Sequence, residues 1–361
     1  MAAQVRDASL MTQPPAESGL SIVIVTYNSA AVLPGLLDSL PAGLEGVKQF
    51  ETIVVDNDSA DNSVDIALAH AIRPRVIRMD RNAGYAAAIN AGAATVRPDA
   101  DLLILNPDIR LLPGTVSLLV RRLTDSSVGV AVPRILAEDG STRWSLRREP
   151  SIMTAWTDAI LGGTFAARIG TGEMIGDPAI YDRGGVIEWA TGAILAVAAR
   201  ARGVVGDWDE SFFLYMEEVD YLRRVRECGL SVAYVPQAQA VHIGGEYSEN
   251  PRLSALLAAN RIRYHRRYHG PLSTAVFRLS IILGEGMRAV RGSPGHRAAV
   301  RAALSPRRLP PESELHHSSS SRRLIVGVLA LALATVFRTP VASSDIVQLR
   351  DVSGESRGEA P

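Results

Sequence analysis

The sequence SIVIVTYNSAAVLPGLLDSL, residues 21–40, passes from an apolar, β-branched run into a helical pattern. The run at 21–27 does not alternate apolar with polar residues, so it indicates a strand that is covered on both faces. A helical candidate follows directly, at 30–40. The stretch therefore predicts one strand–helix unit of a layered α/β fold.

The same unit repeats along the chain up to Arg134. Further apolar runs lie at 51–56, 75–79, 101–106 and 128–133, and helical candidates lie at 63–70, 85–96 and 114–124. This alternation predicts an α/β fold with an open, doubly wound and mostly parallel sheet of the Rossmann-like kind. Ligands of such sheets bind beyond the carboxyl ends of the strands, so the residues that follow each run are the candidates for function.

Composition narrows the range of functions. The chain has 361 residues, with 38 basic and 38 acidic side chains, so it lacks the positive field of a nucleic-acid-binding protein. Its one cysteine, Cys228, excludes an internal disulfide and fits a reducing compartment, which leads us to expect a cytoplasmic protein. Residues 1–19 lack the apolar core of a signal peptide and are expected to be a disordered lead.

The end of the second apolar run offers acceptors for a nucleotide. The turn after the first run, TYNSAA at 26–31, lacks the Gly-x-Gly-x-x-Gly of dinucleotide-binding enzymes. The second run instead continues as VVDNDSADNS, residues 54–63, where Asp56 can accept hydrogen bonds from a base or a ribose. A purely structural role for Asp56, as a capping residue, is the alternative.

The fourth apolar run ends in a candidate metal site. In LLILNPDIR, residues 102–110, Pro107 favours an extended Asn106 and places Asn106 and Asp108 together at the strand mouth. A carboxylate there can hold a hard divalent cation, which in turn can neutralise a diphosphate. His242 follows another predicted strand, near 232–235, and is a further metal ligand, a contact to the phosphates or a structural histidine.

Three acids follow an apolar run in FFLYMEEVDYLRRVRECG, residues 212–229. Glu217, Glu218 and Asp220 could simply favour the first turn of a helix, where unpaired N–H groups carry partial positive charge. In that case Asp220 would pair with Arg224, one turn further on. The alternative is chemistry, because apolar surroundings raise the proton affinity of a carboxylate.

Seven motifs in order resemble one enzyme family. They are VTYN (25–28), VVDNDSAD (54–61), RNAGYAAAIN (81–90), LLILNPD (102–108), WATGAILAVAAR (189–200), DESFFLYMEEVDYLRR (209–224) and VHIGG (241–245). Over about residues 20–270 the chain resembles family-two glycosyltransferases of the GT-A type, especially the actinobacterial rhamnosyltransferase-like members. The resemblance implies an inverting transferase that uses a nucleotide diphosphate sugar and a divalent metal, Mn²⁺ or Mg²⁺.

The resemblance also implies roles for individual residues. The nucleotide-sugar site would comprise Thr26, Tyr27, Asn28, Asp56, Asp58, Asn82, Gly84, Tyr85, Asn90 and Asn106; the acceptor site Trp189, Thr191 and Gly192; and the metal site Asp108 and His242. The family's base is the second acid of a Glu-Asp pair. Glu218 stands at that position here, with a side chain one methylene longer, and we expect it to be the base, supported by Glu217 and Asp220.

The expected domain organisation is a two-part catalytic domain with a C-terminal extension. Residues 20–135 would bind the nucleotide sugar, and residues 136–250 would bind the acceptor and carry the catalytic acids. The remainder is expected to comprise a helical extension at 251–291, a linker at 292–323, a short apolar helix at 324–338 and a disordered tail at 339–361. Its apolar segment, residues 324–337, is too short to span a bilayer, because fourteen residues reach only about 21 Å.

One helix of the extension is a candidate membrane contact. Its apolar side is expected to carry Val276, Leu279, Leu283, Met287 and Val290, with Arg278, Arg288 and Arg291 interleaved or flanking it. Such a helix either lies on a membrane surface or packs on the catalytic domain. Both interpretations remain open at this level.

The sequence thus predicts a membrane-associated glycosyltransferase on the inner face of the cell membrane. It would move a sugar, with rhamnose suggested by the resemblance, from a nucleotide diphosphate to a cell-envelope glycan or a polyprenyl-linked acceptor. A sugar nucleotidylyltransferase and a catalytically inactive nucleotide-sugar-binding protein are the alternatives. The former normally carries a Gly-rich basic loop after the first strand, which is absent from residues 26–31, and the latter is suggested by Glu218 in place of Asp.

Overall fold

The computed structural model describes residues 19–244 and 250–305. These residues belong to the first of two compact units of the chain, residues 1–309. Most of the expected disordered lead, the later part of the expected linker, the short apolar helix and the C-terminal tail lie outside the described residues.

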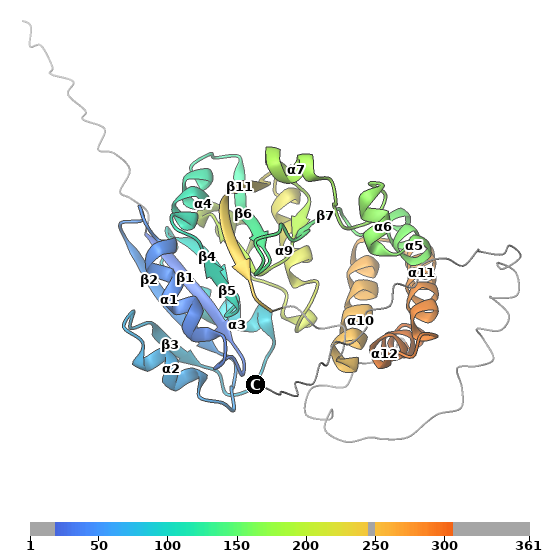
Figure 1. The fold of residues 1–361 in the computed structure, drawn as a ribbon, viewed down its shortest axis with the longest axis horizontal. Helices are drawn as coiled ribbons and strands as arrows, with labels where there is room; N and C mark the ends of the chain where they lie inside the picture. Colours follow the sequence, from blue (N-terminus) through green and yellow to red (C-terminus); the bar gives the residue numbers. More distant parts are fainter. Residues whose placement is uncertain (1–18, 245–249, 306–361) are drawn as a thin grey trace, which may run out of the picture. The chain divides into compact units, whose positions relative to one another are not determined.

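The described part of the chain forms one large mixed sheet, seen at the centre and left of Figure 1. Its strand order is β3-β2-β1-β4-β10-β6-β11-β5, and β8 also pairs with β11. The strands are β1 (Leu20–Thr26), β2 (Phe50–Asp56), β3 (Arg75–Arg78), β4 (Asp101–Leu105), β5 (Ile109–Leu111), β6 (Val128–Leu136), β8 (Gly185–Ile187), β10 (Ile194–Val197) and β11 (Ser231–His242). A separate ribbon pairs β7 (Leu146–Arg147) with β9 (Trp189–Ala190).

The strand directions agree with the expected mostly parallel sheet. The β1 strand pairs in parallel with β2 and β4, β2 does so with β3, and β6 does so with β11. The antiparallel pairings are those of β10 with β4 and β6, and those of β5 and β8 with β11. All seven residues of β1 are buried, which explains why its sequence shows no alternation of apolar and polar positions.

The helices follow the expected strand–helix alternation in the first half of the chain and dominate its second half (Figure 1). They are α1 (Leu33–Gly43), α2 (Ser63–Ala69), α3 (Tyr85–Ala93), α4 (Thr115–Leu123), α5 (Ile152–Leu161), α6 (Gly163–Arg168), α7 (Pro178–Arg183), α8 (Ala199–Val205), the 3₁₀ turn η1 (Glu210–Phe212), α9 (Glu217–Glu227), α10 (Pro251–Tyr268), α11 (Pro271–Ala289) and α12 (Pro294–Leu304). Close contact with the sheet requires a small residue in α3, because a Cβ at Gly92 would lie 2.8 Å from Val23.

The helical extension has a small core of its own. Phe277 and Ile281 of α11 pack with Ala258 of α10 and with Ala299 and Ala303 of α12. This packing corrects the sequence prediction that a linker begins at residue 292, because residues 294–304 form a helix. The Pro, Ser and Arg content of the segment suggested a linker, because the buried face of the helix consists mainly of small residues. None of the described helices is both long enough and apolar enough to cross a bilayer.

Candidate active site

A pocket of about 370 Å³ opens at the carboxyl ends of β1, β2 and β4. Its lining includes seven residues that the sequence placed in the site: Tyr27, Asn28, Asn82, Gly84, Tyr85, Asn106 and Asp108. It also includes Val25, Ser29, Val32, Asn57, Pro107, Phe213, Leu214 and Gly244, which the sequence analysis did not select. The pocket thus lies where an open α/β sheet binds its ligands.

Thr26 and Asp56 hold the pocket wall in place from within the sheet edge. Asp56 is 3% exposed and accepts hydrogen bonds from the Thr26 hydroxyl (3.1 Å) and from the Ser59 backbone N–H (3.0 Å). Neither Thr26 nor Asp56 is part of the pocket lining. Asp58 is exposed and has a left-handed backbone with φ +67°. Asp56 therefore orders the loop that follows β2, which is the structural role that the sequence left open.

Asn57 connects two loops that shape the pocket. Its side-chain amide donates to Asn82 Oδ1 (2.8 Å) and to the Gly84 carbonyl (3.2 Å), and its Oδ1 accepts from the Ala83 N–H (3.0 Å). Gly84 has φ +94°, and a Cβ there would lie 2.4 Å from the Phe213 carbonyl oxygen. Only glycine fits both this conformation and this close approach.

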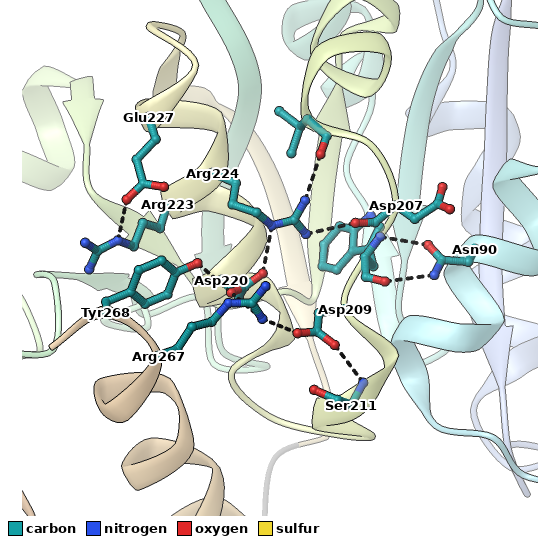
Figure 2. Close-up of polar contacts among 12 residues, drawn as sticks. Asn90, Asp207, Asp209, Ser211, Asp220, Arg223, Arg224, Glu227, Arg267 and Tyr268 are labelled. Carbon is teal, nitrogen blue, oxygen red and sulfur yellow. Dashed lines mark hydrogen bonds and ion pairs between the residues drawn. The ribbon is translucent and has the colours of Figure 1, made fainter. Parts of the chain in front are cut away.

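Asn90 lies outside the pocket lining, although the resemblance implied a place for it in the nucleotide-sugar site. Its side chain makes a two-way contact with the backbone of Trp208, donating to the carbonyl (2.9 Å) and accepting from the N–H (2.9 Å) (Figure 2). It also donates to Glu210 (3.0 Å). Asn90 therefore joins α3 to the segment that precedes the catalytic acids.

Asp108 and His242 come together at one side of the pocket. Asp108 Oδ2 lies 3.0 Å from His242 Nε2. The β5–β11 pairing explains this, because His242 stands opposite Ile109 in the ladder. Asp108 Oδ1 is buried without a hydrogen-bond partner, and a Cβ at Gly244 would lie 2.1 Å from Asp108 Oδ2.

The Asp108–His242 pair fits a divalent cation in part. Carboxylate oxygen and imidazole nitrogen are both ligands for such ions, and Asp108 retains an unused buried oxygen. Among the described residues there is no group of three His, Cys, Asp or Glu side chains that could hold a metal ion. The two side chains could therefore hold a cation only together with oxygens from a ligand or from water.

Glu217 and Glu218 begin α9 and form a pair of carboxyls with raised proton affinity. Glu217 is 3% exposed, and Oε2 of each glutamate is buried without a hydrogen-bond partner. Burial raises the pKa of both carboxyls, and the neighbouring charge of Glu218 raises the pKa of Glu217 further. A carboxylate in such surroundings can accept a proton near neutral pH.

Tyr85 links the acid pair to the pocket. It lines the pocket, and its pKa is raised by burial and then by the charges of Glu217, Glu218 and Asp108. Its hydroxyl donates to the Gly192 carbonyl (3.3 Å), and a Cβ at Gly192 would lie 3.2 Å from Glu218 Cβ. The two carboxyls do not line the pocket themselves, but they are near enough for their charges to affect Tyr85, which does.

The three expected acceptor residues divide into two kinds. Trp189 is 6% exposed, and its indole N–H donates to the Arg148 carbonyl (2.8 Å), so it is part of the protein interior. Thr191 and Gly192 are half-buried, and Gly192 adjoins Glu218. Of the three expected acceptor residues, Gly192 is therefore the one that adjoins Glu218, and Trp189 is part of the interior.

The loop before α9 depends on a residue that the sequence analysis did not select. Phe213, Tyr215 and Met216 have left-handed backbones, with φ of 62°, 68° and 75°. Asn260 of α10 is 2% exposed, and its amide donates to the carbonyls of Phe212 (2.6 Å), Leu214 (2.9 Å) and Tyr215 (3.3 Å). A single sequence cannot show that an asparagine in a basic helix contacts this loop. We identify Asn260 as the positioning residue for this loop.

Asp220 is an anchor and not a free acid. It is fully buried, and it accepts from Arg224 Nε (2.8 Å) and from the Tyr268 hydroxyl (2.6 Å), with Arg267 3.3 Å away (Figure 2). Arg267 also pairs with Asp209. With both oxygens occupied by cations and a hydroxyl, Asp220 is not available to support Glu218, and the Arg224 pairing that the sequence allowed is the one present.

Comparison with known proteins agrees with this geometry. Residues 21–189 match the family model described as glycosyl transferase family 2. The chain is 28% identical over 256 residues to the N-acetylglucosaminyl-diphospho-decaprenol L-rhamnosyltransferase of Mycobacterium tuberculosis (strain H37Rv), covering 68% of this chain and 82% of that relative. It is 34% identical over 137 residues to the undecaprenyl-phosphate 4-deoxy-4-formamido-L-arabinose transferase of Shewanella sediminis, covering 37% of this chain and 40% of that relative.

Solved structures show the same fold at low identity. A crystal structure of GalNAc-T7 with UDP, GalNAc and Mn²⁺ matches with a TM-score of 0.53 and 15% identity, over 70% of this chain and 48% of that one. The mannosyltransferase PcManGT from Pyrobaculum calidifontis, solved with GDP-Man and Mn²⁺, matches with a TM-score of 0.50 and 12% identity, over 80% of this chain and 86% of that one. The expected GT-A type fold is confirmed, and the chain is similar to family-2 glycosyltransferases of the rhamnosyltransferase type, with residues 21–189 matching the family model.

Proposed function

We propose that this glycosyltransferase moves a sugar from a nucleotide diphosphate donor to a polyprenyl-diphosphate-linked glycan. The support for the donor is the pocket at the ends of β1, β2 and β4, with Asp108 in its lining. The support for the acceptor class is the similarity to the mycobacterial transferase, whose name gives a decaprenyl diphosphate glycan as acceptor and L-rhamnose as the sugar. Rhamnose is accordingly the first donor sugar to test.

The Asp108–His242 pair would hold a divalent ion, Mn²⁺ or Mg²⁺. When bound, such an ion neutralises the charge of the donor diphosphate and of the leaving nucleotide. The observation that carries this assignment is the buried, unpartnered Oδ1 of Asp108 beside His242 Nε2.

The remaining chemistry would fall to Glu218 and its neighbours. A base must take the proton of the acceptor hydroxyl on the face of the sugar opposite the diphosphate. The acceptor oxygen then forms a bond to the anomeric carbon, the bond from that carbon to the diphosphate oxygen breaks, and the configuration inverts. Glu218, whose pKa is raised by burial, would take the proton, while Thr191 and Gly192 border the approach of the acceptor.

We further propose that the enzyme works at the cytoplasmic face of the cell membrane. A polyprenyl-linked acceptor resides in the bilayer, and nucleotide sugars are cytoplasmic compounds. The experiment that tests the proposed function is transfer from a panel of nucleotide diphosphate sugars to a water-soluble, short-chain prenyl diphosphate acceptor, with Mn²⁺ or with EDTA. Release of free nucleoside diphosphate together with a glycosylated acceptor supports it, whereas nucleotide sugar synthesis from a sugar phosphate, or donor binding without turnover, would replace it with one of the two alternatives.

A further inference from the structure

The outer side of α11 is an apolar stripe. Helical spacing places seven residues on one side of the helix: Leu272, Ala275, Val276, Leu279, Leu283, Met287 and Val290, the last at the C-cap. Three of them are strongly exposed, Leu272 by 79%, Leu279 by 52% and Val290 by 69%. No polar side chain interrupts the stripe, which contains all five residues that the sequence assigned to an apolar side.

The opposite side of α11 fixes the helix to the protein. Phe277 and Ile281 are buried in the core of the extension. A Cβ at Gly284 would lie 2.9 Å from Ala159 of α5, and Arg288 donates to the Asp158 carbonyl (2.9 Å). One side of α11 therefore packs on the protein, and the apolar stripe on its other side faces solvent.

A basic pocket adjoins this stripe. It has a volume of about 260 Å³ and is lined by Arg266, His269, Pro271, Thr274, Ala275 and Arg278, with no acidic residue. Ala275 belongs to both the pocket and the stripe. Arg266 is exposed and has no partner among the described residues, while Arg278 is held by a bond from its Nε to the Ala303 carbonyl (2.7 Å). His269 Nε2 is buried without a hydrogen-bond partner.

Together the two features have the chemistry of a lipid surface. Two guanidinium groups and an unsatisfied imidazole suit a phosphate, and an apolar stripe next to them suits the acyl region just beneath the phosphates. A soluble phosphate compound would need the pocket but not the stripe. The chain's own apolar segment at 324–337 would suit the stripe, but its flanking residues Arg322, Arg323 and Arg338 would repel the basic pocket.

We propose that α11 and the pocket of Arg266, His269 and Arg278 form a docking surface for an anionic phospholipid bilayer. This rests on the proposed function, since a polyprenyl-linked acceptor must be met at a membrane. The surface also connects with the active site, because α10 carries Arg266 on this surface and Asn260 at the loop before Glu217. Docking would thus hold the catalytic loop at a set orientation to the bilayer.

The test is flotation of the full chain with vesicles that contain no acceptor. We expect binding to phosphatidylcholine vesicles that include phosphatidylglycerol, little binding to phosphatidylcholine alone, and loss of binding in high salt. Two double variants address the two features: Leu272→Ser with Leu279→Ser, and Arg266→Gln with Arg278→Gln. The arginine variant should lower the affinity for the anionic vesicles by roughly thirty-fold, as expected for two charges at such a surface. The leucine variant should lower it by at least about tenfold, because it removes two apolar side chains from the acyl region.

Matched controls use exposed residues on other elements. Val186→Ser on β8 and Arg121→Gln on α4 should leave vesicle binding unchanged. Thermal unfolding and transfer to the soluble acceptor should be unchanged in all variants, so failure of docking is separable from failure of the proposed function. The proposal is overturned if the double variants bind like the controls. It is also overturned if only the arginine variant loses binding, which would mean that the phosphates are contacted without the apolar stripe, or if the leucine variant turns a dimer into a monomer, which would mean that the stripe is an interface between copies of the chain.

Discussion

Asp108 and His242 are brought to 3.0 Å from each other by the last residues of the β5–β11 ladder, at the wall of the donor pocket. A second Asp–His pair, Asp38 and His70 at 3.1 Å, lies on α1 and at the end of α2 and does not line the pocket. The two pairs have similar geometry and different surroundings. They can therefore be used as a test and a control.

We predict that Asp108→Asn and His242→Gln each weaken Mn²⁺-dependent binding of the donor by at least about tenfold, since each removes one of the two proposed protein ligands. Calorimetric titration of the donor, with and without Mn²⁺, measures this. Asp38→Asn and His70→Gln should leave donor affinity unchanged. Donor binding that is equally strong with EDTA in the unaltered protein would refute the metal assignment.

Asn260→Ala should lower kcat/KM by roughly a hundred-fold, because loss of three hydrogen bonds releases the left-handed loop that carries Phe213, Leu214 and Glu217. Steady-state kinetics should show a fall in kcat together with a rise in the KM for the donor, since the loop forms part of the pocket. Asn260→Gln should recover part of the loss. Asn250→Ala, at the N-cap of the same helix, is the control, and an equal loss there would mean that only helix stability matters.

Asp220→Asn should destabilise the fold by about 3 kcal/mol or more, because it leaves Arg224 and Arg267 without their buried counter-charge. Urea unfolding measures this, and donor affinity of the folded fraction should be retained. Asp182→Asn, which breaks a pair with Arg134 whose carboxylate is largely exposed, should cost less than about 1 kcal/mol. If Asp220→Asn has normal stability but no turnover, Asp220 takes part in catalysis, as the sequence analysis expected.

Glu217→Gln should raise stability at neutral pH and leave it unchanged near pH 4. Burial raises the pKa of Glu217 in the folded state above the usual 4.5. Its contribution to stability is therefore fully present below the unfolded pKa and is lost as pH rises through the folded pKa. The difference between variant and unaltered protein should grow across that window to about 1 kcal/mol or more. A difference that is independent of pH would contradict the raised pKa.

The first half of the fold was predictable because burial of both sheet faces leaves a direct mark on the sequence. Runs such as residues 22–25 have no polar positions, and Pro107 marks the mouth of β4. Asp108 and His242 were expected in one metal site, but their direct contact could not be predicted, because it depends on the β5–β11 register, a contact between distant parts of the chain.

What could not be predicted depends on packing between helices. Asn260 and Asn57 act through backbone atoms, which leave no pattern of residue types to detect. Two partners of Asp220 were also unpredictable, because Arg267 and Tyr268 lie on a helix that begins thirty-one residues later in the chain. The α12 helix was missed because its buried face consists of small residues within a basic segment.

The central claim is that the acid pair supplies the base, with Glu218 taking the acceptor's proton. The most direct measurement is the turnover number for transfer by Glu218→Gln, with Glu227→Gln at the exposed end of α9 as control. We expect Glu218→Gln to lower kcat by roughly two to four orders of magnitude, because glutamine cannot accept the proton, while donor affinity stays nearly unchanged. Glu218→Asp should retain substantial activity. If Glu217→Gln is the disabling change instead, the base lies one residue earlier, and if both glutamine variants keep full turnover, the account of the acid pair as the catalytic base is wrong.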